Sequence, residues 1–311
     1  MSSQGSETSE SSASSQPAAG EKPVKLVERG VAVRGVRLAS AMNDASRALL
    51  ARAPLIVLPA AAFSWQDYTP ILEYFGRERR VFALDWPGFG ASEKPAPDAF
   101  TYTSASYAEM LAGWLDGLGI ARAVLLGNGI GATAAIRYAA AHPKRTLGLA
   151  LSGPLGFGAG GRFGRLAGGA LTRPALLRRL EPLLTSLALG PTTPLTTEIA
   201  LRRRAQRTAD DYPASVAAFA ALWRSLAEDR DEMAARAKEV TAPAIVLRGA
   251  LDALVTESDA QRAADALGEH GGVRIELPDA GHLPFLQQPG PFLRAVAGVL
   301  NTAEANMAAQ N

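Results

Sequence analysis

Short apolar runs recur along most of this chain and alternate with longer stretches of helical periodicity. The six clearest runs are 55–58, 81–84, 123–126, 147–151, 244–247 and 273–277. Strands buried on both faces of a parallel sheet give such runs, because helices cover both sides of the sheet. The pattern therefore predicts an α/β fold with a mostly parallel sheet flanked by helices.

Two segments depart from this rhythm. Residues 25–42 alternate apolar and polar positions around Gly30 and Gly35, which predicts an antiparallel hairpin at the sheet edge. Residues 154–241 contain helical runs broken by glycine and proline, but no convincing strand. We interpret this stretch as a helical cap over the carboxyl ends of the strands, where open α/β sheets bind ligands. A separate small helical domain is the alternative.

The chain accordingly divides into a core, a cap and two tails. The core comprises residues 25–153 and 242–302, and the cap comprises residues 154–241. Residues 1–24 are rich in Ser and Glu and have little to bury, so we expect a disordered tail. Residues 303–311 are predicted to form a second, short tail.

The composition of the chain argues against several classes of function. With 48% apolar and 20% charged residues, the chain suits a globular protein with a sizeable core. A net charge of +2 is too balanced for nucleic-acid binding, and the basic cluster Arg202–Arg204 with Arg207 predicts a solvated helix face. The absence of cysteine excludes thiolate chemistry, and only three histidines argue against a histidine metal site. We expect no metal and no cofactor.

The N-terminal region lacks a charged segment followed by an apolar run, so no secretory signal is predicted. The longest apolar stretch, Ala53 to Phe63, has 11 residues, whereas a membrane span needs ~20. We therefore expect a cytoplasmic protein without a membrane span, whose partner is a small-molecule ligand or substrate.

The segment from Val124 to Thr133 has the layout of a buried strand, a sharp turn and a helix start. Gly127 and Gly131 match the frame Gly-x-Ser-x-Gly, the nucleophile elbow that lifts a serine hydroxyl above the edge of a parallel sheet. The central position is Gly129. The frame of the elbow is present and the hydroxyl is absent, so covalent serine or aspartate chemistry cannot run through this residue.

Two later loops carry a candidate acid–base pair. Asp252 follows the fifth apolar run, and His282 follows the sixth in a Gly-His loop. At these strand ends an imidazole can act as general base, and a carboxylate can hold it in one tautomer. Glu257 and Asp259 compete with Asp252 for that second role.

Four motifs together resemble the α/β-hydrolase superfamily, in its cap-bearing branch of esterases, epoxide hydrolases and haloalkane dehalogenases. They are Leu58–Trp65 after one strand, Asp85–Ser92 after the next, the elbow, and the loops of Asp252 and His282. The resemblance covers roughly residues 25–300, and the order elbow, acid, histidine matches the family. It implies the α/β-hydrolase fold with Gly129 at the nucleophile position.

The first strand loop also departs from the family, which usually has His-Gly where this chain has Pro59-Ala60. Proline has no N–H, so any oxyanion-binding amide there must belong to Ala60 or Ala61. Ile130 begins the elbow helix, and its amide is the expected second donor.

Further pocket candidates have structural explanations as alternatives. Asn128 can donate a hydrogen bond to a ligand or support its own loop, and Trp65 and Trp86 can line the pocket or pack in the core. Four other hydroxyl residues are candidates to replace the missing nucleophile, but each is better explained as a helix-capping or core hydroxyl. They are Ser64, Ser92, Thr133 and Ser152.

Three function classes remain open. The first is a protein with a small-molecule pocket and nucleophile-free acid–base chemistry or residual hydrolase activity through His282 and Asp252. The second is an inactive pseudo-hydrolase that binds ligands or acts as a scaffold, like the N-myc downstream-regulated proteins. The third is a hydrolase that uses direct water attack or a displaced hydroxyl. The sequence leaves the natural ligand and the oligomeric state undetermined.

Overall fold

The structure is a computed structural model, and it describes residues 23–44, 47–158, 171–228, 230–270 and 273–309. Its strands form one eight-stranded sheet with the order β1-β2-β4-β3-β5-β6-β7-β8. The strands are β1 (Leu26–Val33), β2 (Val36–Asn43), β3 (Leu55–Leu58), β4 (Val81–Leu84), β5 (Ala123–Asn128), β6 (Thr146–Ser152), β7 (Ala244–Gly249) and β8 (Val273–Leu277). The predicted α/β fold with a mostly parallel sheet is confirmed.

The hairpin β1–β2 lies at one edge of the sheet, and β2 pairs antiparallel with β4. From β4 to β8 all neighbouring strands are parallel. Strands β5 and β6 run past their apolar stretches to Asn128 and Ser152, which pair with each other. The carboxyl ends of the parallel strands therefore meet at one edge, as the sequence predicted.

Helices cover both faces of the sheet. They are α1 (Thr69–Gly76), α2 (Ser104–Gly117), α3 (Ile130–Ala141), α5 (Pro174–Leu189), α6 (Pro194–Gln206), α7 (Tyr212–Glu228), α8 (Arg230–Lys238), α9 (Glu257–Leu267) and α10 (Pro289–Ala309). Successive residues of a strand point to opposite faces. Ile56 and Leu58 pack with α2, α3, α8 and α9, whereas Leu55 and Val57 pack with α1 and α10.

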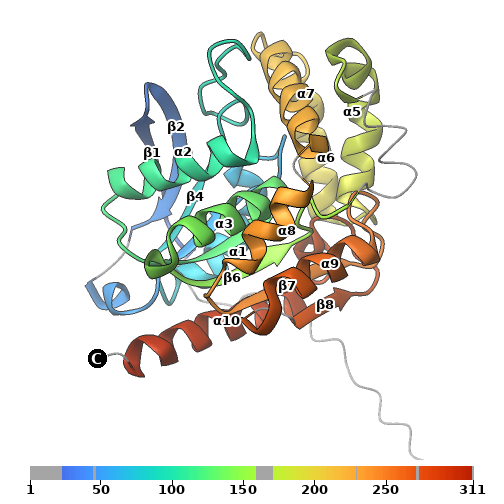
Figure 1. Cartoon of the computed structure of the whole chain (residues 1–311). Helices are drawn as coiled ribbons and strands as arrows, with labels where there is room; N and C mark the ends of the chain where they lie inside the picture. The colour runs from blue at the N-terminus through green and yellow to red at the C-terminus, as the bar shows by residue number, and fades with distance from the viewer. Residues whose placement is uncertain (1–22, 45–46, 159–170, 229, 271–272, 310–311) are drawn as a thin grey trace, which may run out of the picture.

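Helices α5, α6 and α7 form an insertion between β6 and β7, and Figure 1 shows them gathered at one end of the molecule, away from α10. Leu177, Tyr212 and Val216 belong to a small apolar cluster of this insertion. Helix α8 contacts α3 and α9 instead, so it covers the sheet. Met233 and Ala237 of α8 are buried in the core, so the stretch predicted as a cap, residues 154–241, includes a helix that packs on the core.

The two predicted tails have different outcomes. Residues 1–22 of the expected disordered tail lie outside the described residues. At the other end, α10 continues to Ala309, so residues 303–309 are helical where the sequence predicted a tail. The reason is that Ala303 extends the buried face of α10 and Glu304 binds Arg52 and Arg79. None of the helices in the described part of the chain is both long and apolar enough to cross a membrane.

Candidate active site

The turn between β5 and α3 has the backbone of a nucleophile elbow. Gly129 has φ 56° and ψ −117°, a left-handed conformation that glycine adopts without the steric cost of a side chain. A β-carbon at Gly131 would lie 2.1 Å from the Leu58 carbonyl oxygen, and one at Gly127 would lie 2.5 Å from Ala132. The flanking glycines therefore let α3 start directly against the ends of β3 and β5.

The two predicted acid–base residues meet at the same edge of the sheet. His282 Nδ1 lies 2.8 Å from Asp252 Oδ2, and both side chains are buried. Asp252 Oδ1 accepts the backbone N–H groups of Leu254 and Val255 at 2.8 and 3.0 Å. With one oxygen held by two amides, the other accepts a hydrogen bond from Nδ1–H, which leaves the lone pair of the neutral imidazole on Nε2.

The competing carboxylates have other partners. Asp259 caps α9 by accepting the Thr256 N–H and pairs with Arg262, while Glu257 pairs with Arg274 on the surface. Asp252 is therefore the carboxylate that holds the imidazole.

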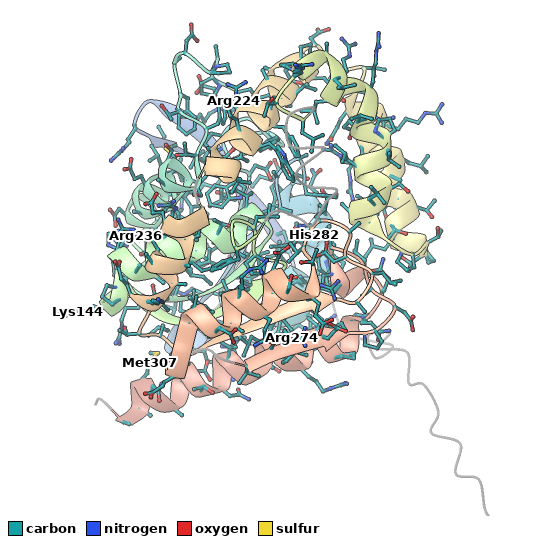
Figure 2. The ribbon with its side chains drawn as sticks, turned by 45° about the vertical axis from the view of Figure 1, so that its right-hand side comes forward. Lys144, Arg224, Arg236, Arg274, His282 and Met307 are labelled. Carbon is teal, nitrogen blue, oxygen red and sulfur yellow. The ribbon has the colours of Figure 1, made fainter. Side chains whose placement is uncertain are left out.

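The imidazole of His282 lies against the elbow. A β-carbon built on Gly129 would be 2.8 Å from Nε2 and 3.3 Å from the Ala60 Cβ. The first distance is shorter than real β-carbons tolerate, so the ring occupies room that a side chain at 129 would need. Figure 2 shows His282 in the interior, beside the yellow helices of the insertion. Its backbone N–H donates to the Ala188 carbonyl of α5, which ties the histidine loop to the insertion.

The predicted anion-binding amides are not equivalent. The Ala60 N–H donates to the Tyr68 hydroxyl at 2.9 Å, so it is already used. Within the described residues, the N–H groups of Ala61 and Ile130 have no partner, and both residues line the cavity beside His282. The Ile130 amide also begins α3, where the helix dipole places partial positive charge. Of the three predicted amides, those of Ala61 and Ile130, here called the amide pair, are therefore the ones without a partner among the described residues.

Asn128 does not line the cavity, which corrects its assignment as a ligand-binding residue. Its Nδ2 donates to the carbonyls of His282 and Ser152 at 2.9 and 3.1 Å, and its Oδ1 accepts from the Tyr68 hydroxyl at 2.7 Å. Because Tyr68 also accepts the Ala60 N–H, this buried amide connects the histidine loop with the loop after β3. Tyr68 carried no sequence signal for this role.

The two tryptophans are structural as well. Trp86 is buried, donates to the Pro59 carbonyl at 2.8 Å and stacks on Tyr107. Trp65 belongs to the core, and its backbone N–H donates to Asp85. The expectation that Trp65 lines the pocket is wrong, because the cavity is bordered by Ala60–Phe63 of that loop and not by Trp65.

None of the four substitute nucleophiles lines the cavity. Thr133 donates back to the Gly129 carbonyl and to Leu155, Ser92 donates to the Asp85 carbonyl, and Ser64 precedes a short helix. Ser152 is buried without a hydrogen-bond partner among the described residues. These hydroxyls are therefore placed as structural groups.

Asp85 holds the loop after β3 through a hydrogen bond to the backbone of Trp65. Its two carboxyl oxygens accept the N–H groups of Trp65 and Ala91 at 2.7 and 2.8 Å. Burial raises the pKa of this carboxyl from 3.8 to about 7, against the lowering effect of those amides. The sequence placed Asp85 in a family motif without assigning it this role.

A cavity of about 140 Å³ opens above Gly129 and His282. Its walls are mainly apolar and come from the core loops and the insertion. Representative wall residues are Phe63, Phe89, Leu155, Val216, Phe219 and Leu222. A concave apolar site with a few convergent polar groups is typical of small-molecule binding.

The basic cluster on α6 differs from its prediction. Arg203 is only 10% exposed and pairs with Glu181 of α5 at 2.8 Å, and it also donates to the Ala62 carbonyl beside the amide pair. Arg202 lies 3.0 Å from the buried Asp67. These arginines therefore join the insertion to the core instead of forming only a solvated face. The sequence does not reveal this, because their partners lie on distant segments.

Comparisons with known proteins agree with the fold. The sequence profile of the alpha/beta hydrolase family matches residues 55–295. A 2-hydroxymuconate semialdehyde hydrolase from Pseudomonas sp. (strain CF600) is 38% identical over 93 residues, which cover 30% of this chain and 32% of that protein. The alignment thus spans only about a third of this curated relative.

Two solved structures are similar over most of their length. The 2-hydroxy-6-oxo-6-phenylhexa-2,4-dienoate hydrolase from Rhodococcus sp. strain RHA1 has a TM-score of 0.73 at 18% identity, covering 89% of this chain and 99% of that one. A putative lipase from Acinetobacter baumannii AYE has a TM-score of 0.74 at 18% identity, covering 90% and 93%. At this identity the likeness shows the fold alone.

Proposed function

This chain belongs to the alpha/beta hydrolase family, and on that premise we propose that it is an enzyme that converts a small apolar carbonyl compound by general-base catalysis. No covalent intermediate forms on residue 129. The observation that carries the proposal is the buried His282–Asp252 pair, placed against Gly129 and bordering an apolar cavity. The curated relative is named as a semialdehyde hydrolase, which fits a carbonyl substrate.

The base is Nε2 of His282. Asp252 holds Nδ1–H, so the free lone pair of Nε2 is available at the cavity, and Asp252 stabilises the imidazolium after proton transfer. General-base catalysis by such a group contributes ~10²–10⁴-fold to a rate. The proton comes either from a water molecule or from the carbon next to the substrate carbonyl.

Both proton sources put negative charge on the carbonyl oxygen. If water is deprotonated, its oxygen forms a bond to the carbonyl carbon and the π pair moves to oxygen. This pair then re-forms the carbonyl, the bond between the carbonyl carbon and the leaving group breaks, and the leaving group takes that electron pair and the proton from Nε2. If a carbon is deprotonated, the C–H pair forms an enolate, and the imidazolium returns the proton. The amides of Ala61 and Ile130 are the donors for this oxyanion, and one such donor contributes ~10²–10³-fold.

The test measures both reactions in one set of variants. p-Nitrophenyl esters with four- to eight-carbon acyl chains report hydrolysis, and deuterium exchange of 4-phenyl-2-butanone in D₂O, followed by NMR, reports carbon deprotonation. We expect at least one reaction above the buffer rate, lowered about 100-fold or more in His282→Ala. His142→Ala is the matched control, because His142 lies at the far end of α3, and it should keep the rate.

Two outcomes contradict the proposal. Turnover that survives in His282→Ala would remove the imidazole from the mechanism. A wild-type protein that promotes neither reaction above buffer would favour the pseudo-hydrolase reading, in which the cavity binds a ligand without converting it.

A further inference from the structure

A second group of polar side chains borders the cavity from the side of the insertion. We call it the Tyr212 cluster; its members are Glu181, Thr185, Arg203, Arg207 and Tyr212. They come from α5, α6 with the residue directly after it, Arg207, and α7, and all except Arg207 line the cavity. The cluster lies next to the loop after β3, because Arg203 donates to the Ala62 carbonyl and its guanidinium lies 5.6 Å from the ring centre of Phe63.

The charges of this cluster do not cancel. Glu181 accepts hydrogen bonds from Thr185, Arg203 and Arg207, so both of its carboxylate oxygens are occupied. Burial raises the pKa of Glu181, but the two arginines and the threonine lower it more, and the net pKa lies below its usual value. Glu181 therefore stays ionised, and one carboxylate faces two guanidinium groups. The surplus charge is positive.

Two hydrogen-bond donors in the cluster have no acceptor. Among the described residues, the buried polar side-chain atoms without a partner include Arg203 Nε and the Tyr212 hydroxyl. None of the other residues with such atoms lines the cavity; they are Asp67, Arg79, Arg80, Trp114, Tyr138, Ser152 and Arg202. Tyr212 is 7% exposed, and burial, followed by Glu181, raises the pKa of its hydroxyl, so it remains a donor. An unsatisfied buried donor is unfavourable, which favours an acceptor from a ligand.

We propose that the Tyr212 cluster binds the carboxylate of an apolar carboxylic acid, whose hydrocarbon part fills the cavity between this cluster and His282. This inference deepens the proposed function and rests on it for the reaction at His282, but the binding step does not require turnover. The Tyr212 hydroxyl and Arg203 supply donors, and the surplus positive charge favours an anion over a neutral group. The mainly apolar wall contacts the hydrocarbon part.

The test uses octanoate and methyl octanoate as probes, with binding measured by calorimetry on the full chain. Wild type should bind octanoate about tenfold or more tightly than the ester, because only the acid presents a carboxylate. Tyr212→Phe should lose about tenfold of the octanoate affinity and bind the ester unchanged. The matched control is Tyr138→Phe, which removes another buried hydroxyl without a partner, away from the cavity, and should bind octanoate like wild type.

Thermal unfolding separates binding from a structural role. Because the Tyr212 hydroxyl has no partner in the free protein, Tyr212→Phe should keep or raise the unfolding temperature without ligand, yet lose most of the octanoate-induced increase. A lower unfolding temperature in the free variant would assign the hydroxyl a structural role and overturn the inference.

The remaining outcomes are also decisive. Equal affinity of wild type for the acid and the ester overturns the carboxylate assignment, as does a Tyr212→Phe variant that binds octanoate like wild type. The His282→Ala variant should bind octanoate normally. In the wild type, octanoate binding without any turnover would reject the proposed reaction and retain the carboxylate site, whereas ester turnover without octanoate binding would reject only the carboxylate site.

Discussion

The two sides of the cavity floor carry polar groups of different kinds. The histidine side, Asp252 and His282, presents side chains whose geometry is fixed by hydrogen bonds to the backbone and to each other. The amide side, Ala61, Gly129 and Ile130, offers a ligand only the backbone N–H groups of Ala61 and Ile130, because the Gly129 N–H donates to the Ser152 carbonyl at 2.9 Å. The left-handed turn at 129 is therefore formed by a residue that presents no side chain to the cavity.

This difference separates two requirements of the site, the backbone turn at 129 and the His282–Asp252 pair. The turn depends on backbone contacts, since Gly127 and Gly131 allow α3 to approach the ends of β5 and β3. The histidine pair depends on side chains, and neither partner can be removed without leaving the other buried and unpaired. Glycine at 129 relieves the strain of the turn, whereas a change at 252 or 282 would disrupt a hydrogen-bonded site. The predictions below test each side separately.

The largest effect is expected on the histidine side, for Asp252→Asn. The amides of Leu254 and Val255 would still hold the side-chain oxygen, so the NH₂ group would face His282 Nδ1 and favour the tautomer protonated on Nε2. Loss of the correct tautomer in a triad lowers kcat by ~10⁴-fold. We expect a loss of about 10³–10⁴-fold in any His282-dependent rate.

Nitrogen-15 NMR of the imidazole checks this prediction without a substrate. The proton should lie on Nδ1 in wild type and on Nε2 in Asp252→Asn. Asp259→Asn, which alters the cap of α9, is the matched control and should keep both the tautomer and the rate. An unchanged tautomer in Asp252→Asn would contradict the assigned role of Asp252.

The next effect concerns Asp85, which supports the amide side through Trp65. Its pKa is raised from 3.8 to about 7 in the folded protein, so folding favours the protonated carboxyl. Stability from this group is complete below about pH 4 and is lost as the pH rises through about 7. The difference corresponds to at most roughly 4 kcal/mol.

Urea unfolding between pH 4 and 8 measures this contribution. The asparagine side chain of Asp85→Asn is uncharged at every pH. The free energy of unfolding of this variant should therefore fall less between pH 4 and pH 8 than that of wild type, by up to about 4 kcal/mol. Asp116→Asn removes an exposed carboxylate and serves as the matched control. If Asp85→Asn and wild type show the same pH slope, the buried carboxyl does not titrate in this range.

The sequence revealed the frame of the site because strand ends follow from apolar runs. A run that predicts a buried strand also marks the loop after it, which placed Gly129, Asp252 and His282 at one edge before any coordinates. The elbow spacing of glycines then identified the turn. These features depend on residues close in sequence, whose pattern reflects local backbone geometry.

The partners of individual groups depend on distant contacts and did not follow from the sequence. The Ala60 N–H is occupied because it donates to the hydroxyl of Tyr68, eight residues later, and that hydroxyl in turn donates to Asn128. Asn128 turned inward to the His282 carbonyl, although its position beside the elbow equally allowed a contact with ligand. Arg203 belongs to a run of arginines that predicted a solvent-exposed helix face. The sequence does not show that its partner, the carboxylate of Glu181, lies on another helix.

The smallest expected effect on stability is that of Gly129→Ser, which places a hydroxyl on the amide side. A side chain at φ 56° costs ~1–3 kcal/mol, and Nε2 of His282 must move away from the new β-carbon. If the ring withdraws while keeping Asp252, the serine hydroxyl meets a general base and two free amides. We expect labelling by a fluorophosphonate probe and hydrolysis of p-nitrophenyl esters.

Gly129→Ala carries the same backbone cost without a hydroxyl, so it should lose similar stability and take no label. Adding His282→Ala to Gly129→Ser should abolish the label, and a folded Gly129→Ser that stays unlabelled would show that the elbow backbone and the histidine side are not aligned for serine chemistry.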